Sequence, residues 1–532
     1  MTSDPPTAAA TDIPHSALRT PHSVVGPGIC EAAMAGLLLL LMLVPNSLLN
    51  SDGDTAHHLA AGRQMLETGS LTPIDIFTQP HFGQPWINWE WLSDVLFALA
   101  NGAAGLNGVA LLAVTLIAGT VYALCRWCMA RGLHPVPTLV LGLLATTTSE
   151  IHWLARPHLF SFALLLLVLY LLEEYRTGRS SARRLALIPP IMVVWANLHA
   201  GFVMGLVLCG AYGLGALLEL GRRRWMQRLP AIASRRAALA TPRAHLRAYT
   251  LTGLAATAAT LLNPYGWGLY AHIIEFLRNP LITHITVEFQ PLDFRYPITW
   301  SFLVLVGVML VVVARTWRWL PPSHALLLAA GTVLALQVAR NVSQFSIIAP
   351  ALLAPLIQRW IAERAGRQPS GFWARYGTPA GRLGIPWLFI GTLALLLGVA
   401  ALGGSVGPWP LLRAAWTEPP LPIRAVATLR APDAPQGPMF NDMTWGGYLL
   451  YELYPQRRVF IDSQVDVYGA TINHDYLTIA TTAAGWDGLL DHYGIAWVIQ
   501  RPTSPLVAAL HARPDQWRET YRDSTAVILQ RR

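Results

Sequence analysis

Repeated apolar runs separated by arginine-rich connections restrict this chain to a helical membrane fold. A helix of about 20 apolar residues crosses the roughly 30 Å hydrocarbon core of a bilayer, although several of these runs are shorter. Only 13% of the residues are charged and 53% are hydrophobic, whereas soluble domains carry about 25% charged residues. We therefore expect a polytopic α-helical membrane protein with about eleven transmembrane helices. The runs occupy residues 31–49, 108–126, 135–150, 158–172, 186–199, 202–220, 248–262, 299–314, 322–338, 344–359 and 385–403.

The basic residues predict how these helices are oriented. All 38 are arginine, and clusters between the runs lie at 126–131, 176–184, 222–247, 315–318 and 359–382. With eleven spans and a cytoplasmic N-terminus, all of these clusters fall on the cytoplasmic side, as the positive-inside rule requires. This placement argues against nucleic acid as a partner, despite the net charge of +9. Because an absence of lysine fits a GC-rich bacterial genome, we expect the bacterial inner (plasma) membrane.

Shifts in composition predict three regions and several local elements. Residues 1–30 are rich in Pro, Thr, Ala and Ser and are expected to form a disordered cytoplasmic tail. Residues 31–404 form the transmembrane region, with a large first external loop at 50–107 that includes an interfacial amphipathic helix at 91–104. Residues 405–532 form a small extracytoplasmic α/β domain. In this domain we expect strands at 458–462, 496–500 and 525–530 and helices at 486–493 and 505–512.

An unusual polar stretch follows the first apolar run directly. Asp52, Asp54, His57 and His58 lie within seven positions, and ionisable groups at the mouth of a membrane helix are costly unless they face water or substrate. Asp54 could instead cap the following helix, but this explains neither the second acid nor the histidine pair. His58 lies one helical turn after Asp54 and would project to the same side, whereas His57 is expected at the surface.

The predicted topology gathers further polar residues at outer helix ends. An arginine fork matches phosphate oxygens, so Arg156 and Arg340 are candidate phosphate ligands, with snorkelling to lipid headgroups as the alternative. Asn197 and His199 could bind a ligand or satisfy exposed backbone at a broken helix. The remaining candidates are Glu90, His158, Asn263 and Glu288.

Several segments resemble the GT-C glycosyltransferases, which include protein O-mannosyltransferases, aminoarabinose transferases and oligosaccharyltransferases. More narrowly, the chain is similar to a largely uncharacterised group of bacterial GT-C-like membrane proteins. The segments are DGDTAHHL at 52–59, PWINWEWL at 85–92, RPH at 156–158, WANLH at 195–199, NPYGW at 263–267 and FNDMTWGGYL at 440–449. They spread over nearly the whole chain, so the resemblance implies a GT-C-like fold throughout.

The resemblance also implies a reaction and roles for the candidate residues. A sugar would pass from a polyprenyl-phosphate donor to an extracytoplasmic glycan, lipid or protein, with membrane lipids as the surroundings. Asp52 or Asp54 would be the general base, with Asp54 favoured, and His58 and Glu90 would assist. No metal is required, although a divalent cation (Mg²⁺ or Mn²⁺) bound by Asp52, Asp54 and Glu288 is an alternative. Donor phosphate and sugar would contact Arg156, His158, Asn197, His199, Asn263, Glu288 and Arg340.

Two other functions also fit a polytopic protein. A transporter or lipid flippase would have many spans and intramembrane polar groups, but the sequence has no internal repeat, and its polar groups gather at one face. A non-catalytic GT-C-like scaffold in envelope glycan assembly is the second alternative, and the intact acidic pair argues against it. Fold alone does not decide between these functions.

Overall fold

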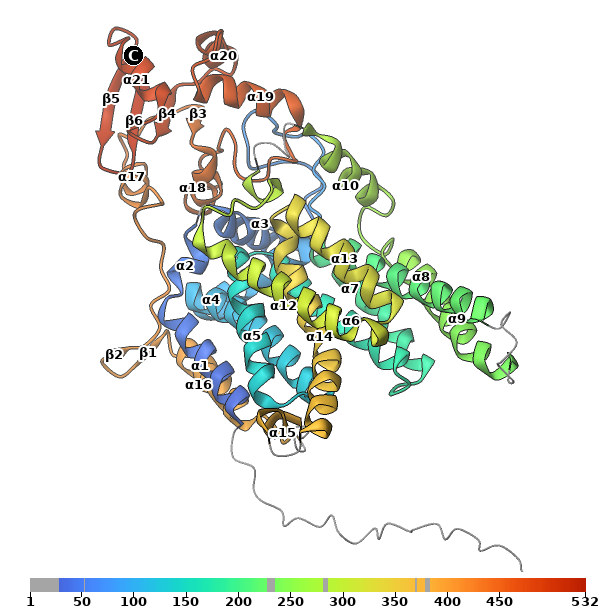
Figure 1. Cartoon of the computed structure of the whole chain (residues 1–532). Coiled ribbons are helices and arrows are strands. Elements are labelled where there is room, and N and C mark those ends of the chain that lie inside the picture. The colour runs from blue at the N-terminus through green and yellow to red at the C-terminus, as the bar shows by residue number, and fades with distance from the viewer. Residues whose placement is uncertain (1–27, 52, 227–234, 281–285, 369–370, 378–382) are drawn as a thin grey trace, which may run out of the picture.

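The computed structural model describes residues 28–532 except 52, 227–234, 281–285, 369–370 and 378–382 (Figure 1). Nearly all of the predicted N-terminal tail, and Asp52, therefore lie outside the described residues. The membrane part is helical, and the C-terminal part, coloured orange to red, lies over one end of it. The α-helices of the membrane part and its loops are α1 Ile29–Leu43, α2 Asn46–Leu49, α3 Asp54–Thr68, α4 Trp91–Ala130, α5 Pro135–Ser149, α6 His158–Arg176, α7 Ile188–Leu198, α8 Phe202–Met226, α9 Arg235–Ala259, α10 Gly268–Arg278, α12 Trp300–Thr316, α13 Pro322–Gln337, α14 Arg340–Arg367, α15 Phe372–Gly377 and α16 Trp387–Ala401.

Length and composition identify candidate membrane spans among these helices. In the described part of the chain, five segments have at least 18 residues and enough apolar character to cross a bilayer. They are Trp91–Ala130, His158–Arg176, Phe202–Trp225, Pro297–Trp319 and Arg340–Arg367. Three shorter apolar helices are Ile29–Leu43, Pro322–Gln337 and Trp387–Ala401. The protein is thus a multi-pass membrane protein, and the number of eleven spans stays a prediction.

A break in α4 separates a helix of the first loop from a spanning helix. Ala104 and Gly105 have non-helical backbone angles, and Gly105 has a φ of 58° and a ψ of −152°, a conformation that favours glycine. The sequence predicts a helix up to 104 and a new span from 108, so the break lies where the two were expected to meet.

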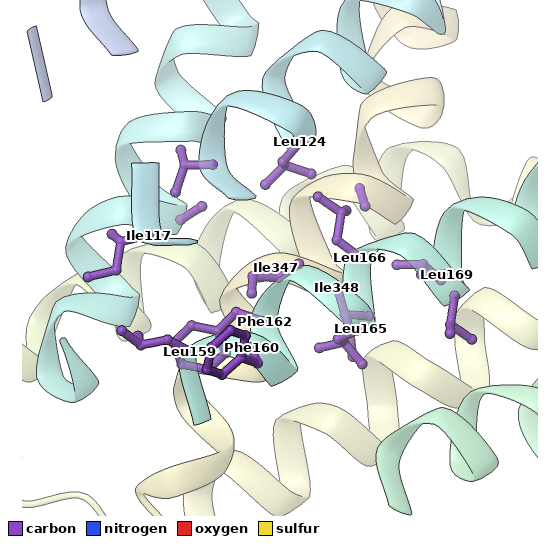
Figure 2. Packing of buried hydrophobic residues seen from close by; sticks show 14 of the residues in the cluster. Ile117, Leu124, Leu159, Phe160, Phe162, Leu165, Leu166, Leu169, Ile347 and Ile348 are labelled. Atoms are coloured by element: carbon purple, nitrogen blue, oxygen red, sulfur yellow. The ribbon is translucent and has the colours of Figure 1, made fainter. Parts of the chain in front are cut away.

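The apolar core of the membrane part surrounds α6. Figure 2 shows Phe160, Leu165 and Leu166 of α6 packed near Ile117 of α4 and Ile348 of α14. Because lipid tails are as apolar as these side chains, close packing rather than exclusion of water holds such helices together. This packing fixes the start of α6, where two candidate residues lie.

The C-terminal region contains a four-stranded sheet in the order β3-β4-β6-β5. β3 and β4 are parallel, and the other neighbouring strands are antiparallel. Two short strands, β1 and β2, form a separate hairpin before it. The elements are β1 Ser405–Val406, β2 Trp409–Pro410, α17 Ile423–Thr428, β3 Met439–Asn441, α18 Gly446–Leu453, α19 Gly469–Ala480, α20 Trp486–His492, β4 Trp497–Gln500, α21 Pro505–His511, β5 Trp517–Arg522 and β6 Val527–Arg531.

Most of the elements predicted for this region are present, and one is wrong. Helices α20 and α21 and strands β4 and β6 form where the pattern predicts them. Residues 458–462 do not form a strand, because only Val459 makes a bridge, to Thr78 of the first loop. The side chain of Asn441 accepts hydrogen bonds from the Phe460 and Ile461 backbones and so replaces a strand neighbour.

Candidate active site

Two glycine contacts seat the C-terminal region against the start of α3. The Gly53 amide donates a 2.6 Å hydrogen bond to the carbonyl oxygen of Thr444. Gly447 of α18 lies so close to Gly53 that no side chain fits between them, and α18 packs along α3. The first loop and the C-terminal region therefore meet at the polar stretch that the sequence singles out.

A buried ion pair strengthens this junction. His57 is only 4% exposed, and its Nδ1 lies 2.6 Å from Asp462 Oδ2; the expectation that His57 is a surface residue is wrong. Burial alone would lower the pKa of His57, but the neighbouring Asp462 carboxylate raises it above its usual value. The Tyr468 hydroxyl donates a further hydrogen bond to Asp462.

Asp54 is the first residue of α3, and side chains from α3 itself and from other segments of the described chain contact its carboxylate or lie beside it. Its carboxylate lies 3.0 Å from Arg156 Nε and accepts hydrogen bonds from Ser463 Oγ (2.6 Å) and Gln464 Nε2 (3.1 Å). Gly53, not Asp54, occupies the N-cap position, so the capping alternative is wrong. Burial would raise the pKa of Asp54, but Arg156, His58 and Ser463 hold it well below its usual range.

His58 lies between two carboxylates. Its Nδ1 is 2.7 Å from Asp94 Oδ1, and its Nε2 is 3.7 Å from Asp54 Oδ2. Burial disfavours the imidazolium, yet the Asp54 and Asp94 carboxylates keep the pKa of His58 well above its usual value. Asn88 Nδ2 donates a 2.7 Å hydrogen bond to the other oxygen of Asp94. Sequence reasoning missed Asp94, whose only signal was an acidic group on a helix of the first loop.

Glu288 joins the two candidate phosphate ligands. Its Oε1 lies 3.3 Å from Arg156 Nη1, and its Oε2 lies 3.9 Å from Arg340 Nε. Burial opposes ionisation, but the two guanidinium groups lower the pKa of Glu288 to about 2. Arg340 Nη2 also lies 3.0 Å from His199 Nε2. Both arginines thus point at the same carboxylate.

Glu90 has a different electrostatic environment. Its carboxylate lies 3.5 Å from His199 Nε2 and 4.0 Å from His58 Nε2. Burial raises the pKa of Glu90 to about 7, against the opposing effect of the charged His58. Asp54 is therefore ionised at neutral pH, whereas Glu90 binds a proton much more readily than Asp54 does. Such a separation of two neighbouring carboxyl groups is typical of acid–base sites.

These groups surround one cavity of about 400 Å³. Five of the predicted site residues beyond Asp54, His58 and Glu90 also line it, and two predicted residues lie elsewhere. Asn197 accepts a hydrogen bond from Trp91 Nε1 and donates to the Leu262 carbonyl, while Asn263 accepts from the Tyr265 amide within its own turn. The five that line the cavity are Arg156, His158, His199, Glu288 and Arg340.

The C-terminal region supplies one wall of the cavity. Met443, Thr444 and residues 463–466 line it, and Asp466 Oδ2 lies 3.0 Å from His272 Nε2 of α10. Sequence reasoning missed Ser463 and Gln464, because a serine and a glutamine in a loop carry no pattern that points to a site.

The described residues do not fit the divalent cation that the sequence allowed as an alternative. Among them, no group of three or more His, Cys, Asp or Glu side chains is arranged to hold a metal ion. Arg156 contacts both Asp54 and Glu288, so a guanidinium already lies where a cation would have to bind these two carboxylates. Asp52, the third residue of the predicted set, lies outside the described residues.

The arrangement of the helices defines a fold class. No family model and no curated protein matches the sequence, but the chain has the fold of the GT-C membrane glycosyltransferases. It is similar to the archaeal oligosaccharyltransferase AglB from Archaeoglobus fulgidus in complex with an inhibitory peptide and a dolichol-phosphate, with a TM-score of 0.53 and 10% identity over 89% of this chain and 69% of that chain. It is also similar to ArnT from Cupriavidus metallidurans bound to undecaprenyl phosphate, with a TM-score of 0.47 and 12% identity over 94% of this chain and 97% of that chain. The predicted GT-C fold is confirmed.

Proposed function

We propose that this protein transfers a sugar from a polyprenyl-phosphate donor to an acceptor on the outer face of the bacterial inner membrane. The observation that carries the proposal is a single cavity lined by an ionised carboxylate, a carboxyl group with a pKa of about 7 and two guanidinium groups. Such a set can accept a proton from a hydroxyl and stabilise a departing phosphate. The GT-C fold, shared with an archaeal oligosaccharyltransferase solved in complex with a dolichol-phosphate, supports this class of donor.

The two arginines are suited to the donor phosphate. A guanidinium donates two parallel hydrogen bonds to phosphate oxygens and stays charged when partly buried. Arg156 and Arg340 are 15% and 32% exposed at the side chain, so they remain accessible from the cavity. As the bond to the sugar breaks, negative charge grows on the phosphate, and both arginines stabilise it.

Asp54 is suited to accept the proton of the acceptor. The acceptor hydroxyl oxygen forms a bond to the anomeric carbon, the bond from that carbon to the phosphate oxygen breaks, and polyprenyl phosphate leaves with the electron pair. The hydroxyl proton passes to the Asp54 carboxylate, and a single displacement inverts the anomeric configuration. When phosphate draws Arg156 away from Asp54, the pKa of Asp54 rises and its carboxylate becomes a stronger base. Glu90 would orient the acceptor, and Asp52 is the alternative base.

The test is transfer of radiolabelled sugar from a panel of polyprenyl-phosphate sugars by the purified full-length protein. We expect Asp54→Asn to lower the rate by about 10²- to 10⁴-fold, the usual contribution of a general base. Asp52→Asn is measured beside it to distinguish the two acids. Asp433→Asn changes an exposed aspartate far along the chain and should retain full activity.

The outcomes separate the proposed activity from its alternatives. Loss of transfer in one of the two first-loop variants identifies the base. If no donor is turned over by a correctly folded protein, and both variants support normal growth, the transferase proposal is wrong. The transporter or flippase function and the scaffold function would then be tested instead.

A further inference from the structure

A second polar cavity lies at the opposite end of the helices from the candidate active site. Its volume is about 540 Å³, within the usual range for ligand pockets. We call it the basic cavity. The residues that line it include Arg176, Glu219, Arg222, Arg223 and Arg318.

The length of helix α6 gives the distance between the two cavities. His158, its first residue, lines the candidate active site, and Arg176, its last, lines the basic cavity. A helix of 19 residues is about 28 Å long, close to the thickness of a bilayer core. The candidate spans that start at Phe202 and Pro297 also end at this cavity. The basic cavity therefore lies at the depth of lipid headgroups, on the face opposite to the candidate active site.

The basic cavity has more positive charge than its carboxylates balance. Arg222 and Arg223 share one carboxylate, that of Glu219, at 3.1 and 2.6 Å. Arg176 is paired with the buried Glu173 at 2.7 Å. Arg318 lies over the Trp317 ring, and in the described part of the chain it has no carboxylate within ion-pair distance.

The shape of the cavity distinguishes it from a simple cluster of arginines at a membrane surface. Tyr212 and Tyr249 form a buried floor, and Trp317 and Trp319 form an aromatic edge of the kind found at membrane interfaces. Close packing of Gly215 against Ser323 joins α8 to α13 beneath it. A concave, cationic site between span ends, with an apolar rim, suits a phosphate group attached to an apolar body.

We propose that the basic cavity binds a phosphate-bearing anion, with Arg222 and Arg318 as its main ligands. An anionic phospholipid headgroup and a soluble phosphate share this chemistry. The depth of the site and its tryptophan edge favour the lipid. Because the cavity is separate from the candidate active site, the proposal does not depend on the transferase function.

The experiment compares two double variants of the full-length protein in detergent. Arg222→Gln with Arg318→Gln removes two charges from the cavity. Arg224→Gln with Arg315→Gln removes two charges from the same helix ends, and both residues are exposed and outside the cavity. Melting temperature and retained lipid are measured with added phosphatidylglycerol, with phosphatidylcholine and, at matched ionic strength, with inorganic phosphate.

We expect phosphatidylglycerol to stabilise the wild type more than phosphatidylcholine does. The cavity variant should bind phosphatidylglycerol about tenfold or more weakly, the loss expected when a charge-assisted hydrogen bond is removed, and the control should bind like the wild type. The same pattern with inorganic phosphate and not with lipid supports a soluble phosphate as the ligand. Equal weakening in both variants, or no preference for either phosphate source in the wild type, overturns the proposal.

Discussion

Replacing Gly447 by alanine tests whether close packing of the C-terminal region on α3 is needed to position the side chains of the candidate active site. A Cβ atom at Gly447 would collide with the Gly53 carbonyl oxygen and would lie 2.9 Å from His57 Cβ. The Gly53 carbonyl group is backbone, and the His57 Cβ atom is fixed to its own backbone, so neither can move away as the end of a flexible side chain could. Because alanine favours helix more than glycine does, by about 1 kcal/mol, any loss must come from this collision.

The expected losses of stability and of activity follow from the contacts that α18 makes at Gly447 and Gly446. Overpacking of this kind costs about 1–3 kcal/mol, and α18 relieves it by moving away from α3. Gly446 packs against the backbone of Ile461 and Asp462, so this movement also carries Ser463 away from Asp54. A displacement on the order of 1 Å at a catalytic group lowers the rate by about 10²-fold. We therefore expect a lower melting temperature and about 10²-fold slower sugar transfer.

The assay compares Gly447→Ala with Gly488→Ala, in thermal unfolding and in sugar transfer. Gly488 also lies in a short helix of the C-terminal region, and a Cβ atom there meets nothing within 4 Å. The control should be at least as stable as the wild type, because alanine favours helix, and it should be equally active. If the two variants behave alike, the contact between Gly447 and Gly53 does not position the site, and the reasoning is refuted.

Four further results are expected from the same transfer assay. Ser463→Ala removes a hydrogen bond to Asp54 and should slow transfer about tenfold or more, without changing the melting temperature by more than a few degrees. The wild-type rate should change as pH passes through about 7, where Glu90 ionises, and Glu90→Gln should abolish that inflection while leaving others in place. Arg156→Lys keeps the charge but loses the planar fork, so the KM for the donor should rise more than kcat falls. EDTA should leave transfer unchanged; if EDTA stops transfer and Mg²⁺ restores it, a metal site that includes Asp52 exists.

The membrane part of the fold could be predicted because its signal is local. Apolar length and arginine clusters lie within single segments, and the break at Gly105 lies between the segment that contains Asp94 and Asn101 and the apolar run that begins at 108. In the C-terminal region, β4 and α21 also carry their own patterns. The apolar segment at 458–462 predicts a strand, but its Phe460 and Ile461 amides donate hydrogen bonds to the Asn441 side chain and not to a neighbouring strand. A side chain that takes the place of a neighbouring strand as hydrogen-bond acceptor cannot be recognised from the periodicity of the sequence.

The candidate site could be predicted only as a set of isolated residues. Asp54, Arg156 and Arg340 stand out because charge is unusual beside apolar runs. Ser463 approaches Asp54 from 409 positions away, and no property of Ser463 itself indicates this contact. Asn197 and Asn263 have the same sequence signal, a polar residue at a helix end, but Asn197 donates to the Leu262 carbonyl and Asn263 accepts from the Tyr265 amide.

The charges around the cavity alternate in sign, and this alternation indicates where a phosphate would enter. The order along the contacts is Asp94, His58, Asp54, Arg156, Glu288 and Arg340. Arg340 ends the series, is the more exposed of the two arginines and has the longest contact with Glu288, at 3.9 Å. A phosphate would therefore reach Arg340 first and compete with the weakest of these pairs. Once Glu288 is displaced, Arg156 loses a carboxylate that it contacts and can turn to the phosphate. Asp54 then becomes more basic at the moment when the acceptor must be deprotonated.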